Sequence, residues 1–212
     1  MLRAVLFDLD GVLVNACDLH FEALNRALEP YGCPIPYEEH LAGFNGLPTA
    51  VKLKRLSEEG KLPLDAHEPV HQAKQKYTIE LIEDRIEPDS TKVELLEILR
   101  LSGLKIGVCS NAITESVGRM LKAVGVERLP HLVLGNEAVS NNKPYPDIYW
   151  AACQRLGLQP YESTIVEDSP IGLQAAEAAG PRSVIAVSGP QEVNVTLLNR
   201  ILEEPQELRR AA

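Results

Sequence analysis

The sequence has no long apolar run, it has only four cysteines, and it has fewer positively than negatively charged residues. No uninterrupted apolar stretch approaches the roughly 18 residues of a membrane-spanning helix, so we expect no membrane partner. The 21 lysines and arginines are outnumbered by 30 aspartates and glutamates, and the net charge of −9 argues against binding to nucleic acid or to an anionic membrane surface. Asp8 and Asp10 interrupt the one early apolar run, so we also expect no signal peptide.

The four cysteines follow no C-x-x-C spacing and no paired framework; they are Cys17, Cys33, Cys109 and Cys153. This pattern favours reduced thiols in a cytoplasmic protein and argues against structural zinc. The 212 residues, 45% hydrophobic and 24% charged, are typical of a globular chain with one large domain or a core domain plus a small one.

Five short apolar runs predict the strands of a parallel sheet. They cover residues 4–7, 104–110, 131–135, 163–169 and 183–187. Helical periodicity lies between them, over 113–124, 148–156 and the alanine-rich segment 170–179, which ends at Gly180. Strand and helix alternating from about residue 104 predict an α/β fold with a doubly wound, Rossmann-like, five-stranded parallel sheet.

The segment 16–87 contains apolar stripes at helical spacing and no convincing strand. We therefore divide the chain into an α/β catalytic core domain, residues 1–15 and 88–212, and an inserted helical-bundle cap domain, residues 16–87. The insert begins within a few residues of an acidic pair, which favours a lid over a site. A helical decoration that only packs is the alternative. We expect the tail, residues 203–212, to be a frayed end.

Two carboxylates, Asp8 and Asp10, follow the first apolar run directly. Residues two apart on a strand point to the same side, so the two charges would lie close together. At about 5 Å they would repel by roughly 3 kcal/mol at an effective dielectric constant near 20. The pair therefore requires a cation, a shared proton or bulk water, and Gly11 allows a sharp turn immediately after it.

Polar residues also follow three of the later strand candidates, namely Ser110 and Asn111, then Lys143, then Glu167 and Asp168. Ligands of an open parallel sheet bind at the carboxyl ends of its strands, so these residues should converge with the acidic pair. Carboxylates suit Mg²⁺, while a hydroxyl, backbone amides and a lysine suit phosphoryl oxygens. The set indicates phosphoryl transfer with a carboxylate in position to act as the nucleophile.

The ordered motifs "DLDGV", "SN", "KP" and "EDS" resemble those of the haloacid dehalogenase superfamily of phosphotransferases. The helical insert resembles the small α-helical cap of that superfamily, and the resemblance covers nearly the whole chain. The first twenty residues look like those of β-phosphoglucomutase and its sugar-phosphatase relatives. Each motif alone is weak, whereas four motifs in order, each at a predicted strand end, are specific.

The resemblance implies catalytic roles for three residues. Asp8 would be the nucleophile and would carry a phospho-aspartyl intermediate. Asp10 would be the general acid/base, protonating the leaving oxygen and later activating water. Lys143 would neutralise the charge that Asp8 and the phosphate bring together.

The resemblance also implies binding roles. Ser110 and the amide of Asn111 would hold phosphoryl oxygens. The Mg²⁺ set would comprise Asp8, the backbone carbonyl of Asp10, Asp168 and Glu167, the last either as a ligand or as a support through water. His20 corresponds to a histidine that positions the acid/base carboxylate in the mutase; a half-buried helix residue is the alternative.

Two departures argue against mutase activity. The mutase pattern has a lysine where this chain has Ile113, and the cap loop "LAGFNGLPTA" lacks the arginine that grips a second phosphate. We therefore favour a Mg²⁺-dependent phosphatase that acts on a small phosphorylated metabolite, with a sugar phosphate as the preferred candidate. We expect the protein to be a monomer or a weak homodimer. A β-phosphoglucomutase-like phosphotransferase stays an alternative. From a different class, so does a phosphorylation-driven receiver-type switch.

Several cations follow the cap loop, Lys52, Lys54 and Arg55, and two more lie on a later helix, Lys74 and Lys76. They are able to attract an acidic metabolite. A run of this kind more often forms the solvated face of a helix, which is what we expect here.

Overall fold

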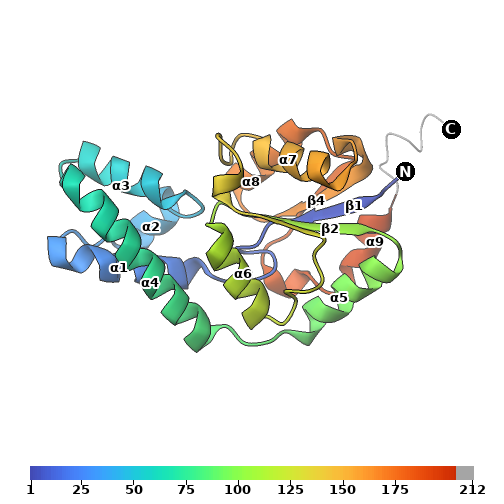
Figure 1. The fold of residues 1–212 in the computed structure, drawn as a ribbon, viewed down its shortest axis with the longest axis horizontal. Helices are drawn as coiled ribbons and strands as arrows, with labels where there is room; N and C mark the ends of the chain where they lie inside the picture. Colours follow the sequence, from blue (N-terminus) through green and yellow to red (C-terminus); the bar gives the residue numbers. More distant parts are fainter. Residues whose placement is uncertain (204–212) are drawn as a thin grey trace. The chain divides into compact units, whose positions relative to one another are not determined.

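A five-stranded, fully parallel sheet forms the centre of the computed structural model, which describes residues 1–203 (Figure 1). Its strands are β1 (Ala4–Phe7), β2 (Lys105–Cys109), β3 (Leu132–Leu134), β4 (Ser163–Glu167) and β5 (Ser183–Ala186). They lie in the order β3-β2-β1-β4-β5. Leu6 in the central strand pairs with Gly107 on one side and Ile165 on the other. This arrangement confirms the predicted doubly wound α/β fold.

The central strand is apolar on both faces because both faces are covered. All four residues of β1 are completely buried. In a parallel sheet that is covered by helices on both sides, each strand has a continuous run of apolar residues. The four apolar residues of β1 were therefore enough to predict the strand. The strand places Asp8, the next residue, at its carboxyl end.

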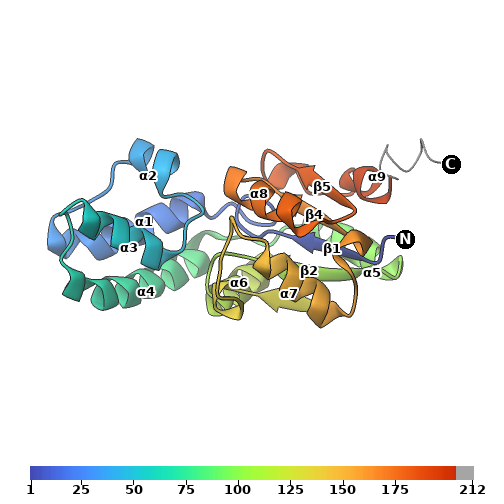
Figure 2. The same cartoon turned by 90° about the horizontal axis from the view of Figure 1, so that it is seen from above.

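Helices cover both faces of the sheet (Figure 1). They are α5 (Ser90–Leu101), α6 (Thr114–Ala123), α7 (Asp147–Leu156), α8 (Pro170–Ala179) and α9 (Leu197–Leu202). Seen from above, α7 and α8 lie over the strands (Figure 2), and α7 contacts β2 and β3 while α8 contacts β4 and β5. The three helical segments predicted here are observed, and α8 ends at Gly180 with φ +70°. The structure adds α5 and α9, which no prediction named.

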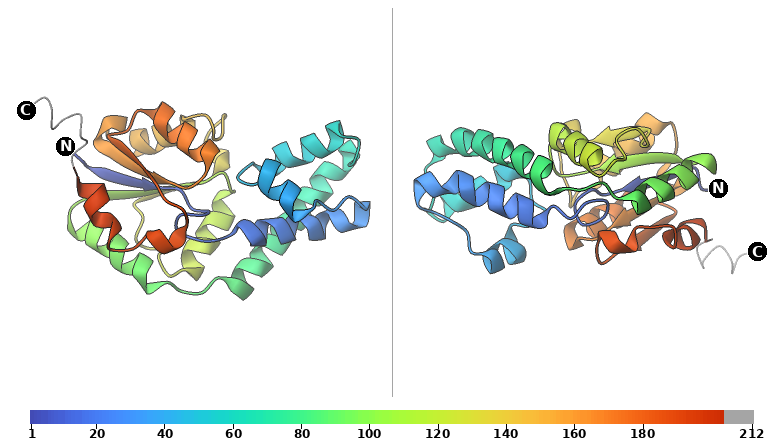
Figure 3. Two further views of the ribbon diagram at one scale, coloured as in Figure 1. Left: turned by 180° about the vertical axis from the view of Figure 1, so that it is seen from behind. Right: turned by 90° about the horizontal axis from the view of Figure 1, so that it is seen from below.

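The insert is a compact helical unit of residues 16–86, and the other unit comprises residues 1–15 and 87–212. Its helices are α1 (Cys17–Leu28), α2 (Tyr37–Gly43), α3 (Thr49–Glu58) and α4 (His67–Arg85), and these residues form no strand. Helices α1 and α4 pack along each other (Figure 3). Their apolar core includes Leu24, Leu28, Phe44, Leu53 and Val70.

The prediction of a solvated cationic face is wrong for two lysines of the insert. Lys52 is 5% exposed and Lys74 is 6% exposed. The other three cations are exposed and pair with a glutamate four residues on, as predicted for a solvated face: Lys54, Arg55 and Lys76. Helical spacing explains the difference, because Lys52 shares a buried face with Leu56, and Lys74 shares one with Val70 and Thr78.

Among the described helices, none is long and apolar enough to cross a membrane. Of the segment 203–212 that was expected to be a frayed end, all but Glu203 lies outside the residues that the structure describes.

Candidate active site

The first carboxylate of the acidic pair lies just beyond β1. The backbone N–H of Asp8 donates to the carbonyl of Val166 at 3.0 Å, which continues the ladder by one bond. The chain then turns sharply: Gly11 has φ +84°, a left-handed conformation that favours glycine, and its N–H donates to Val14. Asp8 is therefore held against the sheet, whereas Asp10 belongs to the loop after it.

Lys143 is the centre of the polar cluster at this edge of the sheet. Its Nζ lies 2.5 Å from Asp8 Oδ1 and 2.6 Å from Glu167 Oε1, and it donates to the carbonyl of Cys109 at 2.9 Å. Burial on its own would lower the pKa of Lys143, but the two carboxylates outweigh it and the pKa is raised. Lys143 is therefore a permanently charged ammonium.

One lysine does not neutralise all the carboxylates. Burial raises the pKa of Asp8 well above its usual value; Lys143 opposes that shift, and the negative charges of Glu167 and Asp10 add to it. An ionised Asp8 therefore needs more positive charge than Lys143 supplies. A divalent cation beside it would meet that need.

Glu167 is completely buried and both of its carboxylate oxygens are engaged. Oε1 accepts a hydrogen bond from Tyr149 Oη at 2.5 Å in addition to its contact with Lys143. Oε2 accepts a hydrogen bond from the backbone N–H of Asp168 at 3.2 Å. Oε2 also lies so close to Gly172 that a side chain there would clash with it, since a Cβ built on Gly172 would be 2.1 Å away. In this arrangement Glu167 holds Lys143 in place.

Tyr149 was not predicted as part of the site. It is fully buried on α7, and the ammonium of Lys143 lies 5.0 Å from its ring centroid. In the sequence Tyr149 lies among apolar residues at helical spacing, which is the pattern of a helix packed on the core. No local feature of the sequence therefore indicates that Tyr149 belongs to the site.

Asp168 provides the clearest indication of a cation site. Asp8, Glu167 and Asp168 each offer an oxygen, and the three oxygens lie within 4.8 Å of one another. Asp168 Oδ1 is buried and has no hydrogen-bond partner among the described residues. Burial, followed by the charges of Glu167 and Asp10, raises the pKa of Asp168 to about 6. Closely spaced carboxylates with an unsatisfied buried oxygen fit Mg²⁺, which prefers hard oxygen ligands.

The glycine of the first motif makes room for this carboxylate. A Cβ built on Gly11 would lie 1.9 Å from Asp168 Oδ2, a distance that no side chain tolerates. The residue after the acidic pair must therefore be glycine on two grounds, its positive φ and the close approach of Asp168.

Ser110 and Asn111 follow β2, and in the contacts among the described residues only Asn111 has a hydrogen bond to a residue of the cluster. Ser110 is buried, and its Oγ accepts a hydrogen bond from the N–H of Ala112 at 3.0 Å. The side chain of Asn111 makes two hydrogen bonds to the backbone of Lys143. Asn111 Oδ1 accepts from the N–H of Lys143 at 3.1 Å, and Asn111 Nδ2 donates to the carbonyl of Lys143 at 3.3 Å. The "SN" motif thus also fixes the segment that carries the lysine.

His20 belongs to the helical insert. It is half-buried on α1, and its Nδ1 lies 3.2 Å from Lys74 Nζ. Its role beside the acid/base carboxylate stays a prediction.

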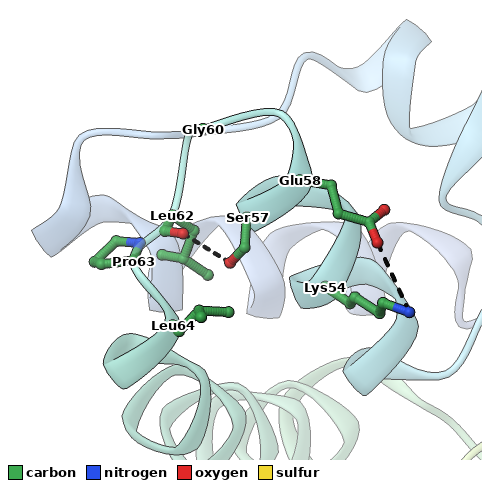
Figure 4. A pocket seen from close by; sticks show the side chains of 7 residues that line it. All are labelled: Lys54, Ser57, Glu58, Gly60, Leu62, Pro63 and Leu64. Atoms are coloured by element: carbon green, nitrogen blue, oxygen red, sulfur yellow. Dashed lines mark hydrogen bonds and ion pairs between the residues drawn. The ribbon is translucent and has the colours of Figure 1, made fainter.

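A pocket of about 630 Å³ also lies in the insert (Figure 4). It is lined by Lys54, Ser57, Glu58, Gly60, Leu62, Pro63 and Leu64. Ser57 Oγ donates to the carbonyl of Leu62 at 2.7 Å, and Lys54 pairs with Glu58. None of the predicted site residues lines this pocket, and its polar groups already bind one another. The pocket therefore shares no residue with the carboxylate cluster.

Comparison with known proteins identifies the family. The family model for haloacid dehalogenase-like hydrolases matches residues 5–186. A phosphorylated carbohydrates phosphatase of Thermotoga maritima is 30% identical over 189 residues, covering 88% of this chain and 85% of that protein. A phosphoglycolate phosphatase of Salmonella typhi is 30% identical over 202 residues, covering 86% of this chain and 80% of that protein.

A solved structure agrees at the level of the fold. The crystal structure of a β-phosphoglucomutase from Clostridium difficile has a TM-score of 0.81 at 21% identity, covering 94% of this chain and 96% of that one. Since the family model spans most of the chain, and since the four motifs meet at the carboxyl ends of parallel strands, the chain belongs to the haloacid dehalogenase-like hydrolases and is an enzyme of that class, as the motifs predicted.

Proposed function

We propose that this hydrolase is a Mg²⁺-dependent phosphatase that releases phosphate from a small phosphorylated metabolite, best a sugar phosphate. The observation that carries the proposal is the cluster of Asp8, Lys143, Glu167 and Asp168 at one edge of the sheet. The printed names of the two relatives, one acting on phosphorylated carbohydrates and one on phosphoglycolate, support the substrate class.

The first half-reaction begins at Asp8. A carboxylate oxygen of Asp8 attacks phosphorus and the bond to the leaving oxygen breaks, which leaves the phosphoryl group on the aspartate. Asp10 gives its proton to the leaving oxygen, so the product departs as a neutral alcohol. Lys143 stays charged and stabilises the negative charge that collects on Asp8 and on the phosphoryl oxygens.

The second half-reaction returns the enzyme to its starting state. Asp10, now ionised, takes a proton from water, and the hydroxyl oxygen attacks phosphorus and displaces Asp8. Ser110 and the amide of Asn111 hold phosphoryl oxygens during both steps. Mg²⁺ would be held by Asp8 and Asp168, with the backbone carbonyl of Asp10, and would supply positive charge that draws electron density from the phosphoryl group. Glu167 would support the metal site through water.

The first test is phosphate release from a panel of sugar phosphates, short acid phosphates and nucleotides, with Mg²⁺ and with a chelator. We expect release from one class of compound that requires Mg²⁺ and returns when Mg²⁺ is restored, because one lysine does not neutralise the carboxylate cluster. Release that is equal in chelator would contradict the metal role. Conversion of a hexose phosphate only with a bisphosphate primer would instead indicate the mutase.

Tyr149→Phe tests whether the hydrogen bond from Tyr149 to Glu167 helps to position Lys143. This change removes the hydroxyl that donates to Glu167 and keeps the ring near Lys143. Because a buried acceptor loses a donor, we expect stability to fall by about 1–3 kcal/mol. We also expect kcat to fall several-fold while KM changes little, since Lys143 is then held less precisely. Urea unfolding and steady-state kinetics measure the two effects.

Tyr145→Phe is the matched control, because Tyr145 is 59% exposed. If the two tyrosine variants behave alike in both assays, Tyr149 has no part in positioning the lysine.

A further inference from the structure

The segment at the end of β3, residues 134–137, is hydrogen-bonded to the loop that follows β2. Because β2 and β3 are neighbouring parallel strands, the segments after them leave the same edge of the sheet. The carbonyl of Leu134 accepts from the N–H of Ser110 at 3.0 Å, which extends the ladder by one bond. The backbone N–H of Asn136 then donates to the carbonyl of Ala112 at 2.9 Å. We call residues 134–137 the β3 brace.

Two side chains of the β3 brace add hydrogen bonds to the same loop. Asn136 Nδ2 donates to the carbonyl of Asn111 at 3.0 Å. Both carboxylate oxygens of Glu137 accept from the N–H of Thr114 at 3.0 Å, and Oε2 also accepts from the Thr114 hydroxyl at 3.2 Å. Thr114 is the first residue of α6, and Ile113 before it has no side-chain oxygen that could cap the helix. Glu137 therefore supplies that acceptor from a different part of the chain.

Gly135 allows the two segments to approach this closely. A Cβ built on Gly135 would lie 2.3 Å from the backbone nitrogen of Thr114 and 2.5 Å from Glu137 Oε2. A backbone atom cannot turn aside as the end of a flexible side chain does, so a side chain at this position would push the β3 brace away from the loop. Any residue can adopt the φ of −95° found here. Close approach is therefore the reason that the structure gives for this glycine.

The loop that the β3 brace contacts carries groups of the active site. Asn111 makes two hydrogen bonds to the backbone of Lys143. The ammonium of Lys143 in turn contacts Asp8 and Glu167. An unbroken path of hydrogen bonds thus leads from Asn136 through Asn111 to the segment that carries the lysine.

We propose that Asn136 and Glu137 are positioning residues for the reaction, an inference that rests on the proposed phosphatase function for its effect on rate. Each acts through the loop at residues 110–114. Asn136 fixes Asn111 and thereby Lys143, and Glu137 fixes the end of the loop at α6. A displacement of about 1 Å in groups that stabilise a transition state costs on the order of a hundredfold in rate, so the loss of one of these hydrogen bonds should lower kcat.

Steady-state kinetics of Asn136→Ala tests the effect on the reaction. The change removes the donor to the carbonyl of Asn111 and keeps the backbone hydrogen bond to Ala112. With the ester that the wild type hydrolyses fastest, we expect kcat to fall at least tenfold and KM to stay within threefold. The reason is that the placement of charged groups matters most in the transition state. Asn194→Ala is the matched control, because Asn194 Nδ2 also donates to a backbone carbonyl, that of Gln191 at 2.8 Å. The control should leave kcat within twofold.

Hydrogen exchange measured by NMR tests the same path without a substrate. The backbone N–H of Lys143 donates to Asn111 Oδ1, so its exchange should become faster when Asn111 is held less firmly. In Asn136→Ala we expect the exchange rate of this amide to rise at least fivefold more than the rates of the buried β1 amides. The β1 amides report global stability, and the ratio therefore isolates a local effect.

Glu137 provides a second and independent pair of variants. Glu137→Ala removes the acceptors for the N–H and hydroxyl of Thr114, and we expect kcat to fall at least threefold. Glu137→Gln keeps one oxygen that accepts from this N–H and should restore most of the loss. Rescue by the neutral amide shows that the hydrogen bond matters and the charge does not. Thermal unfolding shows whether each variant is folded at the assay temperature.

The exchange experiment separates this inference from the proposed function. If the wild type hydrolyses no ester, the phosphatase proposal fails, and the exchange rate of Lys143 alone decides whether the β3 brace fixes the lysine: a local rise supports the inference and an unchanged rate overturns it. If the wild type is active, kcat within twofold of the wild type in both Asn136→Ala and Glu137→Ala overturns it. An equal rise in exchange at Lys143 and in β1 also overturns it, because the brace would then contribute to global stability only.

Discussion

Replacing Asp8 by asparagine is expected to lower turnover by at least about a thousandfold, because an amide oxygen is a far poorer nucleophile than a carboxylate. The change is nearly isosteric, and the amide oxygen still accepts from Lys143, so the fold should persist. No phosphoryl group should be transferred to the protein in a single-turnover experiment. Phosphate release and trapping of labelled protein by acid quench measure the two quantities.

The same variant should be at least as stable as the wild type near neutral pH without metal. Burial raises the pKa of Asp8 above its unfolded value. A carboxyl group with a raised pKa costs stability once the pH exceeds the unfolded value, because the folded state holds the proton more tightly. A neutral amide removes that cost, and Lys143 is not left unpaired because it keeps its ion pair with Glu167. Reduced turnover together with retained stability would show that Asp8 acts in the reaction and is not required for the fold.

Asp84→Asn is the control for this prediction, since the Asp84 side chain is 76% exposed. It should change neither turnover nor stability. Asp10→Asn should differ from Asp8→Asn by still accepting a phosphoryl group, only slowly. Turnover of Asp8→Asn within tenfold of the wild type would refute the nucleophile assignment.

Replacing Lys143 by methionine is expected to remove both activity and stability. The change leaves Asp8 and Glu167 buried without the ammonium that contacts both of them. Removing one member of a buried ion pair costs about 3–5 kcal/mol. For a chain of this size, that corresponds to a fall in Tm of roughly 10 °C. Turnover should fall by at least about a hundredfold, because the charge beside the reacting carboxylate is lost.

A double-mutant cycle isolates the Asp8 contribution. Lys143→Met should cost less stability in the Asp8→Asn background, since one of the two stranded carboxylates is then absent. Lys122→Met, an exposed lysine on α6, serves as the surface control. Equal losses of stability in both backgrounds would mean that the contact between Lys143 and Asp8 contributes nothing to the fold.

The α/β core could be predicted because its signals are local. The run Ala4–Phe7 is apolar at every position since the strand is covered on both faces. The helix over 170–179 stops at a glycine that adopts the left-handed conformation its backbone requires. Neither inference needed knowledge of any residue distant in the sequence.

The members of the acidic cluster could be named from the sequence for a topological reason. Parallel strands bring their carboxyl ends to one edge, so residues 135 positions apart, such as Asp8 and Lys143, meet without any local signal that links them. Predicting that these residues converge required only the strand assignments. Predicting which atoms touch required the packed side chains.

Local patterns in the sequence were enough to predict the five strands, three of the helices between them, a resemblance to the family, and the charged residues that follow the strands. The partners of those charges could be named only from the packed structure. It showed that Tyr149 and Lys143 share one oxygen of Glu167, and that Lys52 and Lys74 are buried where a solvated face was predicted. The physical reason is that periodicity follows backbone geometry within one element, whereas burial and pairing depend on which other elements pack against it.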